Sequence, residues 1–229
     1  MRDYLKSHPF LSMDKSLNEF EPSLLESKFS KISDDIIRFS DEHQDFCVGI
    51  VDIVNSTRVS AYLSKEKVCK YYSIFINSMG TIVKEFGGKI VKNIGDSLLF
   101  YFPNTSCQNQ LSASLLDSLY CGQTMLKDRE IINSIMVDER LPTISYRISM
   151  DYGIITTAKC IGSDCDDIFG PPVNICTKIN HYAHQNSMVV GGDLYELVKT
   201  FKEFNFRFVR DFSNGFRLKY PVFSVVAEH

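Results

Sequence analysis

Two short apolar segments flank the dipeptide Gly95-Asp96, and this pattern constrains the fold more than any other in the chain. Residues 89–94 precede the dipeptide and residues 97–102 follow it. Two strands joined by a two-residue turn that contains glycine are typical of a β-hairpin. A further apolar run, residues 46–51, ends at Asp52 and predicts a buried strand. The sequence therefore places one aspartate at a hairpin tip and another at the end of a strand.

Strand and helix patterns alternate through the rest of the chain. The longest helical pattern covers about residues 65–86 and stops at Gly87-Gly88. Further helices are predicted at about 106–126, 173–184 and 194–198, and further strands at 144–150, 153–161, 188–190, 204–211 and 216–227. Residues 128–142 have the polar composition of a connection. This mixture predicts one α+β or α/β domain with a single core.

The first 44 residues differ in character from the remainder. They are polar, with apolar side chains at helical spacing: Leu24, Leu25, Phe29, Ile32, Ile36 and Ile37. This spacing predicts one amphipathic helix over about residues 21–40, which we expect to pack on the main domain or on a partner subunit. The chain is therefore divided into an N-terminal helical extension, residues 1–44, and a main domain, residues 45–229.

The composition argues against several classes of protein. The formal net charge of -3 gives no electrostatic reason to expect nucleic-acid binding. No apolar run reaches the roughly 18 residues of a membrane helix, and the N-terminus lacks the apolar segment of a signal peptide. The seven cysteines include no CxxC pair, which favours reduced thiols over a zinc site. We therefore expect a cytoplasmic protein with no membrane span and no nucleic-acid partner.

Asp52 and Asp96 form a candidate metal site. Adjacent strands can bring a strand end and a hairpin tip together, and two close carboxylates repel each other unless a cation or a proton lies between them. Oxygen ligands suit Mg²⁺ or Mn²⁺, and two such ions can activate a hydroxyl and hold a triphosphate. Residues 53–57 follow Asp52 and lead into a helix, whose free backbone N–H groups can bind phosphate. The pattern indicates metal-dependent phosphate chemistry.

Three segments together resemble a known family. Residues 51–57, 86–96 and 167–178 read VDIVNST, FGGKIVKNIGD and DIFGPPVNICTK. In this order and at this separation they resemble the class III adenylate and guanylate cyclase domain, over about residues 46–227. The resemblance implies a ferredoxin-like α+β fold that works as a head-to-tail homodimer, with active sites shared between the two subunits. Residues 45–229 are then the catalytic domain.

The resemblance also assigns roles to individual positions. Asp52, Asp96 and Ile53 match the ligands of two Mg²⁺ or Mn²⁺ ions. The turn formed by Ile53, Asn55, Ser56 and Thr57 matches the segment that binds the substrate phosphates. Lys92 and Asp167 match the residues that recognise adenine, and Asn174 matches the residue that orients the ribose. Lys178 stands where the family usually has an arginine that stabilises the transition state; lysine keeps the charge but loses the bidentate geometry.

The implied function is an adenylate cyclase that converts ATP to 3′,5′-cyclic AMP and pyrophosphate at a homodimer interface. A lysine can donate to adenine N1 and a carboxylate can accept from the 6-amino group, whereas the carbonyl of guanine would repel the carboxylate. Cytosine also carries an exocyclic amine. The alternatives are therefore a cyclase for CTP, UTP or GTP, or a degenerate domain that only binds nucleotide or dimerises.

Other positions depart from the family pattern or remain unassigned. The family often has a lysine before a glycine near the C-terminus, where this chain has Asn214 and Gly215, and either Arg217 or Lys219 is a candidate replacement. His181 follows Lys178 on the same predicted helix and is interpreted as a surface or interface residue.

Overall fold

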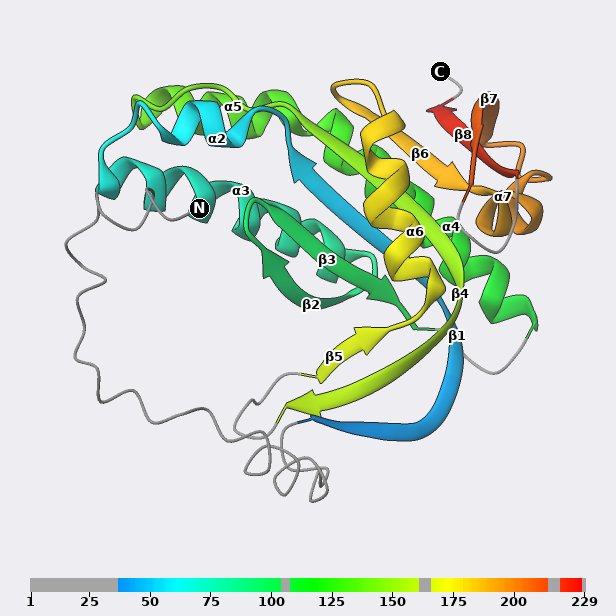
Figure 1. Cartoon of the computed structure of the whole chain (residues 1–229). Coiled ribbons are helices and arrows are strands. Elements are labelled where there is room, and N and C mark those ends of the chain that lie inside the picture. The colour runs from blue at the N-terminus through cyan, green and yellow to red at the C-terminus, as the bar shows by residue number, and fades with distance from the viewer. Residues whose placement is uncertain (1–36, 104–107, 161–165, 214–218, 228–229) are drawn as a thin grey trace, which may run out of the picture. The chain divides into compact units, whose positions relative to one another are not determined.

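The computed structural model describes residues 37–103, 108–160, 166–213 and 219–227. The strands are β1 (Ile37–Ile53), β2 (Lys89–Ile94), β3 (Ser97–Phe102), β4 (Tyr146–Cys160), β5 (Asp166–Phe169), β6 (Ser187–Gly191), β7 (Phe204–Phe212) and β8 (Tyr220–Ala227). They form one sheet in the order β2-β3-β1-β4-β6-β8-β7, with β5 paired to β4 (Figure 1). The predicted mixture of helices and strands around one sheet, of class α+β, is confirmed.

The predicted hairpin is present as β2 and β3, which pair antiparallel with Ile94 opposite Ser97. Gly95 has a φ of 63°, at the position where two-residue turns favour glycine. On its other side β3 pairs antiparallel with β1, and this register sets Asp52 opposite Ser97. The strand end and the hairpin tip therefore meet, as the sequence predicts.

The helices are α2 (Ser56–Ser60), α3 (Lys65–Glu85), α4 (Gln108–Lys127), α5 (Arg129–Asp138), α6 (Pro171–Ile179) and α7 (Gly192–Val198), with a 3₁₀ turn, η3 (Asn180–Tyr182). Side chains from α3, α4, α5 and α7 form the main core with one face of the sheet. Helix α6 lies on the opposite face, and its Cys176 packs with Val48 and Ile50 of β1 (Figure 1). Because side chains alternate along a strand, Asp52 lies on the same face as Ile50.

Several predicted boundaries are wrong. Residues 37–40 belong to β1 rather than to the predicted helix. The Phe39 ring contacts Phe169 of β5, and further along β1 His43 Nδ1 is hydrogen-bonded to Thr156 Oγ1 of β4 at 2.8 Å. The rest of that helix lies outside the described residues. The compact unit that carries the sheet begins at Arg38.

Two further corrections concern the middle of the chain. Residues 128–142, predicted as a connection, contain α5, because Ile132 and Met136 lie one helical turn apart and are both buried in the main core. The segment predicted as two strands, residues 144–150 and 153–161, contains the single strand β4. It stays extended because β6 pairs with its first half and β5 with its second.

The thiols in the described part of the chain are free, with Cys47, Cys121 and Cys176 buried and Cys69 exposed. No helix in the described ranges has the length and apolar character needed to cross a membrane.

Candidate functional site

The sheet brings Asp52 and Asp96 together at the end of β1. Ser97 Oγ donates a hydrogen bond of 2.5 Å to Asp52 Oδ1. Ser56 Oγ, in the first turn of α2, donates to Asp96 Oδ2. The Ile53 N–H donates to the Asp96 backbone carbonyl at 3.4 Å. Both aspartates are therefore held by neighbouring hydroxyl groups and by the strand pairing.

The electrostatic environment of Asp52 favours a bound cation. The pKa of Asp52 is raised, mainly because the carboxyl group is partly buried and also because the charge of Asp96 lies nearby. The Ser97 hydrogen bond and the charges of Arg147 and His181 oppose this rise. A divalent cation beside Asp52 would relieve the repulsion between the two carboxylates.

Few protein groups near Asp52 and Asp96 could serve as metal ligands. In the ranges that the structure describes, no group of three or more His, Cys, Asp and Glu side chains could hold a metal ion. Ile53 is buried in the core, so only its backbone carbonyl could serve as a ligand. The two carboxylates and one carbonyl fit Mg²⁺ or Mn²⁺, which commonly take their remaining ligands from water and phosphate.

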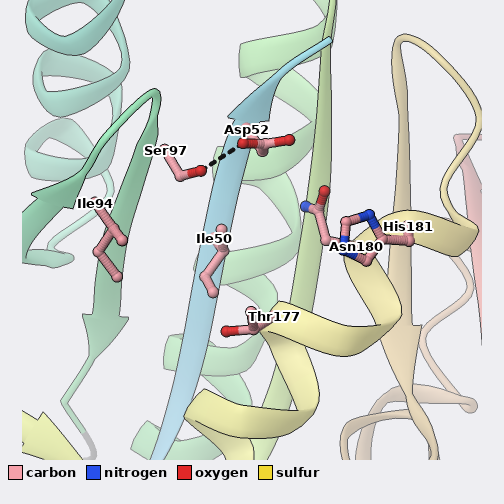
Figure 2. Close-up of a pocket in the computed structure, with 7 residues that line it drawn as sticks. All are labelled: Ile50, Asp52, Ile94, Ser97, Thr177, Asn180 and His181. Atoms are coloured by element: carbon pink, nitrogen blue, oxygen red, sulfur yellow. Dashed lines mark hydrogen bonds between the residues drawn. The ribbon is translucent and has the colours of Figure 1, made fainter. Parts of the chain in front are cut away.

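A pocket of about 160 Å³ lies beside Asp52. Its lining residues come from β1, from the β2–β3 hairpin and from the α6–η3 segment: Ile50, Asp52, Ile94, Ser97, Thr177, Asn180 and His181 (Figure 2). Asn180 anchors this wall, since its Nδ2 donates to Ser149 Oγ at 3.2 Å and to the Arg147 carbonyl at 3.4 Å. The pocket is smaller than the several hundred Å³ typical of nucleotide-sized ligands.

Arg147 is a site residue that the sequence analysis missed. Its charge acts on Asp52, and its Nε is buried without a hydrogen-bond partner among the described residues. A buried N–H of a guanidinium group is costly to leave unpaired, so this atom is a candidate donor to an anionic group. The sequence carried no signal for it, because Arg147 lies in an ordinary strand pattern of β4.

The turn after Asp52 leads directly into α2. Asn55, the residue before this helix, has a left-handed backbone with a φ of 60°, and the Val54 N–H donates to the Ser145 carbonyl at 2.8 Å. Within the described residues, the N–H groups of Asn55, Ser56 and Thr57 donate no such backbone bond. Those three N–H groups could therefore contact phosphate oxygens.

The remaining predicted residues fall into two groups apart from this pocket. Lys92 on β2 and Asp167 on β5 form an ion pair, and Asp167 Oδ1 also accepts from the Ile168 N–H at 2.8 Å. Asn174 and Lys178 are exposed on α6, one turn apart on the same face. Neither lines the pocket beside Asp52. Asn214, Gly215 and Arg217 lie outside the described residues, whereas Lys219 is exposed.

Comparisons with known proteins agree with this arrangement. Residues 39–215 match the family model of the adenylate and guanylate cyclase catalytic domain. In solved structures, the adenylyl cyclase CyaB from P. aeruginosa superposes with a TM-score of 0.72 at 20% identity, over 82% of this chain and 96% of that chain. The fold is therefore that of the class III cyclases.

Curated relatives match smaller shares of the chain. An adenylate cyclase from Streptomyces coelicolor is 22% identical over 143 residues, which are 62% of this chain and 31% of that protein. A cytidylate cyclase from Staphylococcus aureus is 25% identical over 179 residues, 73% of this chain and 41% of that protein. The chain thus spans less than half the length of these two relatives.

Proposed function

The chain belongs to the adenylate and guanylate cyclase catalytic domain family, and on that premise we propose that it converts ATP to 3′,5′-cyclic AMP and pyrophosphate. The observation that carries the proposal is the meeting of Asp52 and Asp96 at the end of β1, where the charge of Arg147 acts on Asp52. The carboxylates can hold cations, and the Nε of Arg147, which has no partner among the described residues, can donate to phosphate. A nucleoside triphosphate with bound divalent ions presents both kinds of partner.

We assign two Mg²⁺ or Mn²⁺ ions to Asp52, Asp96 and the Ile53 carbonyl. When bound, these ions would lower the pKa of the ribose 3′-hydroxyl and neutralise charge on the phosphates. Ser97 and Ser56 orient the two carboxylates through their hydrogen bonds. The orientation of the ligands is thus fixed before substrate arrives, which reduces the cost of binding.

The chain's own donors position the triphosphate. Arg147 Nε donates to a phosphate oxygen, and the N–H groups of Asn55, Ser56 and Thr57 donate to others. Fixed donors of this kind stabilise the charge that develops as the 3′-oxygen attacks and pyrophosphate leaves.

Lys92 and Asp167 recognise the base in this proposal. The Lys92 ammonium donates to a ring nitrogen, and the Asp167 carboxylate accepts from an exocyclic amine. Adenine offers this pair of groups, and cytosine offers the same pair, whereas guanine and uracil present a carbonyl and a ring N–H. The pair therefore selects an amine-bearing base, and ATP is the preferred substrate by the match of Lys92 and Asp167 to adenine-reading positions.

Asn174 and Lys178 complete the site of a second subunit. They are exposed, they do not line the pocket beside Asp52, and that pocket is too small for a whole nucleotide. A homodimer would bring these two side chains of one chain to the metal pair of the other. There Asn174 orients the ribose, and the Lys178 ammonium stabilises charge on the α-phosphate.

A cytidylate cyclase is the second candidate, because the S. aureus enzyme matches 73% of this chain. The experiment that decides between the two bases is a comparison of initial rates with ATP, CTP, GTP and UTP in the presence of Mn²⁺, with products identified by mass. Cyclic AMP as the main product supports the proposal. Cyclic CMP as the main product would mean that CTP, not ATP, is the substrate. Rates with GTP or UTP equal to the rate with ATP would contradict the assigned roles of Lys92 and Asp167.

A further inference from the structure

His181 lies in η3, directly after α6, and lines the pocket beside Asp52 (Figure 2). Its side chain is exposed, and its charge acts on the Asp52 carboxyl. It was interpreted from the sequence as a surface or interface residue. Its exposure agrees with that interpretation, and the structure adds that its side chain lines the pocket that also contains Asp52.

The other hydrogen-bond donors of the pocket are already used within the protein. Ser97 Oγ donates to Asp52, Thr177 Oγ1 donates to the Val173 carbonyl at 3.0 Å, and the Asn180 amide group donates to Arg147 and Ser149. The His181 ring makes no hydrogen bond within the described residues, and it belongs to no group that could hold a metal ion. Among the side-chain donors of the described pocket lining, the His181 ring N–H is therefore the one that has no partner within the protein and can bind a ligand.

The α6–η3 segment presents two neighbouring stripes of side chains. Thr177 and His181 are four residues apart and face Asp52 of their own chain. Asn174 and Lys178 form the adjoining exposed stripe, which is proposed above to face a second subunit. One segment can therefore serve the site of its own chain through His181 and the site of the partner through Lys178.

The surroundings of His181 define what it would bind. The charge of Arg147 also lowers the pKa of Asp52, and its Nε has no hydrogen-bond partner among the described residues. The remaining pocket walls include the apolar side chains Ile50 and Ile94. A polyanion held against Asp52 by divalent cations would meet both donors.

We propose that the His181 ring N–H donates a hydrogen bond to a phosphate oxygen of the bound nucleoside triphosphate, in the subunit that also supplies Asp52. This rests on the proposed function. His181 then binds substrate on the pyrophosphate side of the site, independently of the base.

The test is isothermal titration calorimetry of the full chain with pyrophosphate in the presence of Mn²⁺. The variant His181→Ala should weaken pyrophosphate binding by about tenfold, the usual size of one lost charge-assisted hydrogen bond. His181→Gln, which retains an N–H donor, should recover part of this loss. The matched control His184→Ala removes an exposed histidine that does not line the pocket and should bind as the wild type does.

The inference is overturned if His181→Ala binds pyrophosphate as tightly as the wild type, if His184→Ala shows the same loss, or if the wild type binds no pyrophosphate. Unchanged thermal unfolding of His181→Ala excludes a folding defect as the cause of a loss. A wild type that binds pyrophosphate but cyclises no nucleotide would refute the proposed function and leave the comparison of His181 with His184 intact. In an active enzyme, His181→Ala should raise KM for ATP and CTP by similar factors.

Discussion

The ammonium group of Lys92 on β2 is paired with the carboxylate of Asp167 on β5. Lys92 is about half exposed and Asp167 is less so, with side-chain exposures of 46% and 19%. The two proposed base-reading groups thus neutralise each other when no base is present. A base that enters between them must offer an acceptor to the lysine and a donor to the aspartate, or it leaves a charge unpaired.

Replacing Lys92 with glutamine should therefore lower kcat/KM for the preferred nucleotide by about tenfold or more, since a charged hydrogen bond is lost. Steady-state kinetics with purified protein measure this. Lys89→Gln is the matched control, because Lys89 is an exposed lysine on the same strand. Equal losses in both variants would contradict base reading by Lys92.

The metal assignment predicts the behaviour of Asp52→Asn and Asp96→Asn. Each should reduce Mn²⁺ affinity at least tenfold, because a carboxylate ligand becomes a neutral amide. The Asp52→Asn variant should still fold, since an amide oxygen can accept the Ser97 hydrogen bond. Titration calorimetry with Mn²⁺ tests this against Asp138→Asn, which removes an exposed carboxylate at the end of α5. Unchanged Mn²⁺ binding in both Asp52→Asn and Asp96→Asn would contradict the proposal that these two carboxylates bind the metal ions.

A site shared between two subunits predicts complementation. Asp52→Asn and Lys178→Ala should each be nearly inactive alone. An equal mixture should recover roughly a quarter of the wild-type rate, because about half of the dimers are mixed and each mixed dimer has one intact site. No recovery after subunits have exchanged, checked with differently tagged chains, would place both residues in the same chain's site.

The buried carboxyl group of Asp151 predicts a pH dependence of stability. It accepts hydrogen bonds from Tyr220 Oη at 2.7 Å and from the Leu194 N–H at 3.3 Å. Burial raises its pKa from 3.8 to about 7. The folded chain therefore holds this proton more tightly than the unfolded chain, so the stability contribution is complete below about pH 4 and is lost as the pH rises to 7.

Urea unfolding of the wild type and Asp151→Asn at several pH values between 5 and 8, in roughly unit steps, measures this effect. The free energy of unfolding of the wild type should fall relative to the variant as the pH rises, by at most about 1.4 kcal/mol per pH unit. Parallel pH profiles for the two proteins would show that Asp151 does not titrate in this range.

The sequence was sufficient for the parts of the fold that local patterns determine. The β2–β3 hairpin follows from glycine at a two-residue turn, and α3 follows from its helical period and from the glycines that end it. The meeting of Asp52 with Asp96 was expected only if their strands are neighbours, and the antiparallel pairing of β1 with β3 meets that condition.

The rest depends on tertiary contacts that no local pattern encodes. Residues 37–40 are extended because Phe39 packs against Phe169, which lies far away in sequence. Arg147 and His181 join the site only because β4 and η3 lie beside the end of β1. Helix α5 was missed because its segment was interpreted as a polar connection, whereas Ile132 and Met136 are buried in the core and Ile131 and Ile135 are exposed.

The most direct measurement is mass spectrometry of the products formed from a nucleoside triphosphate by the wild type and by Asp52→Asn, each with Mn²⁺ at equal protein concentration. The wild type should yield a 3′,5′-cyclic nucleotide, cyclic AMP from ATP, with an equal amount of pyrophosphate, and Asp52→Asn should yield neither. Absence of a cyclic product from all four nucleotides, or an undiminished yield with Asp52→Asn, would contradict cyclisation at the metal pair.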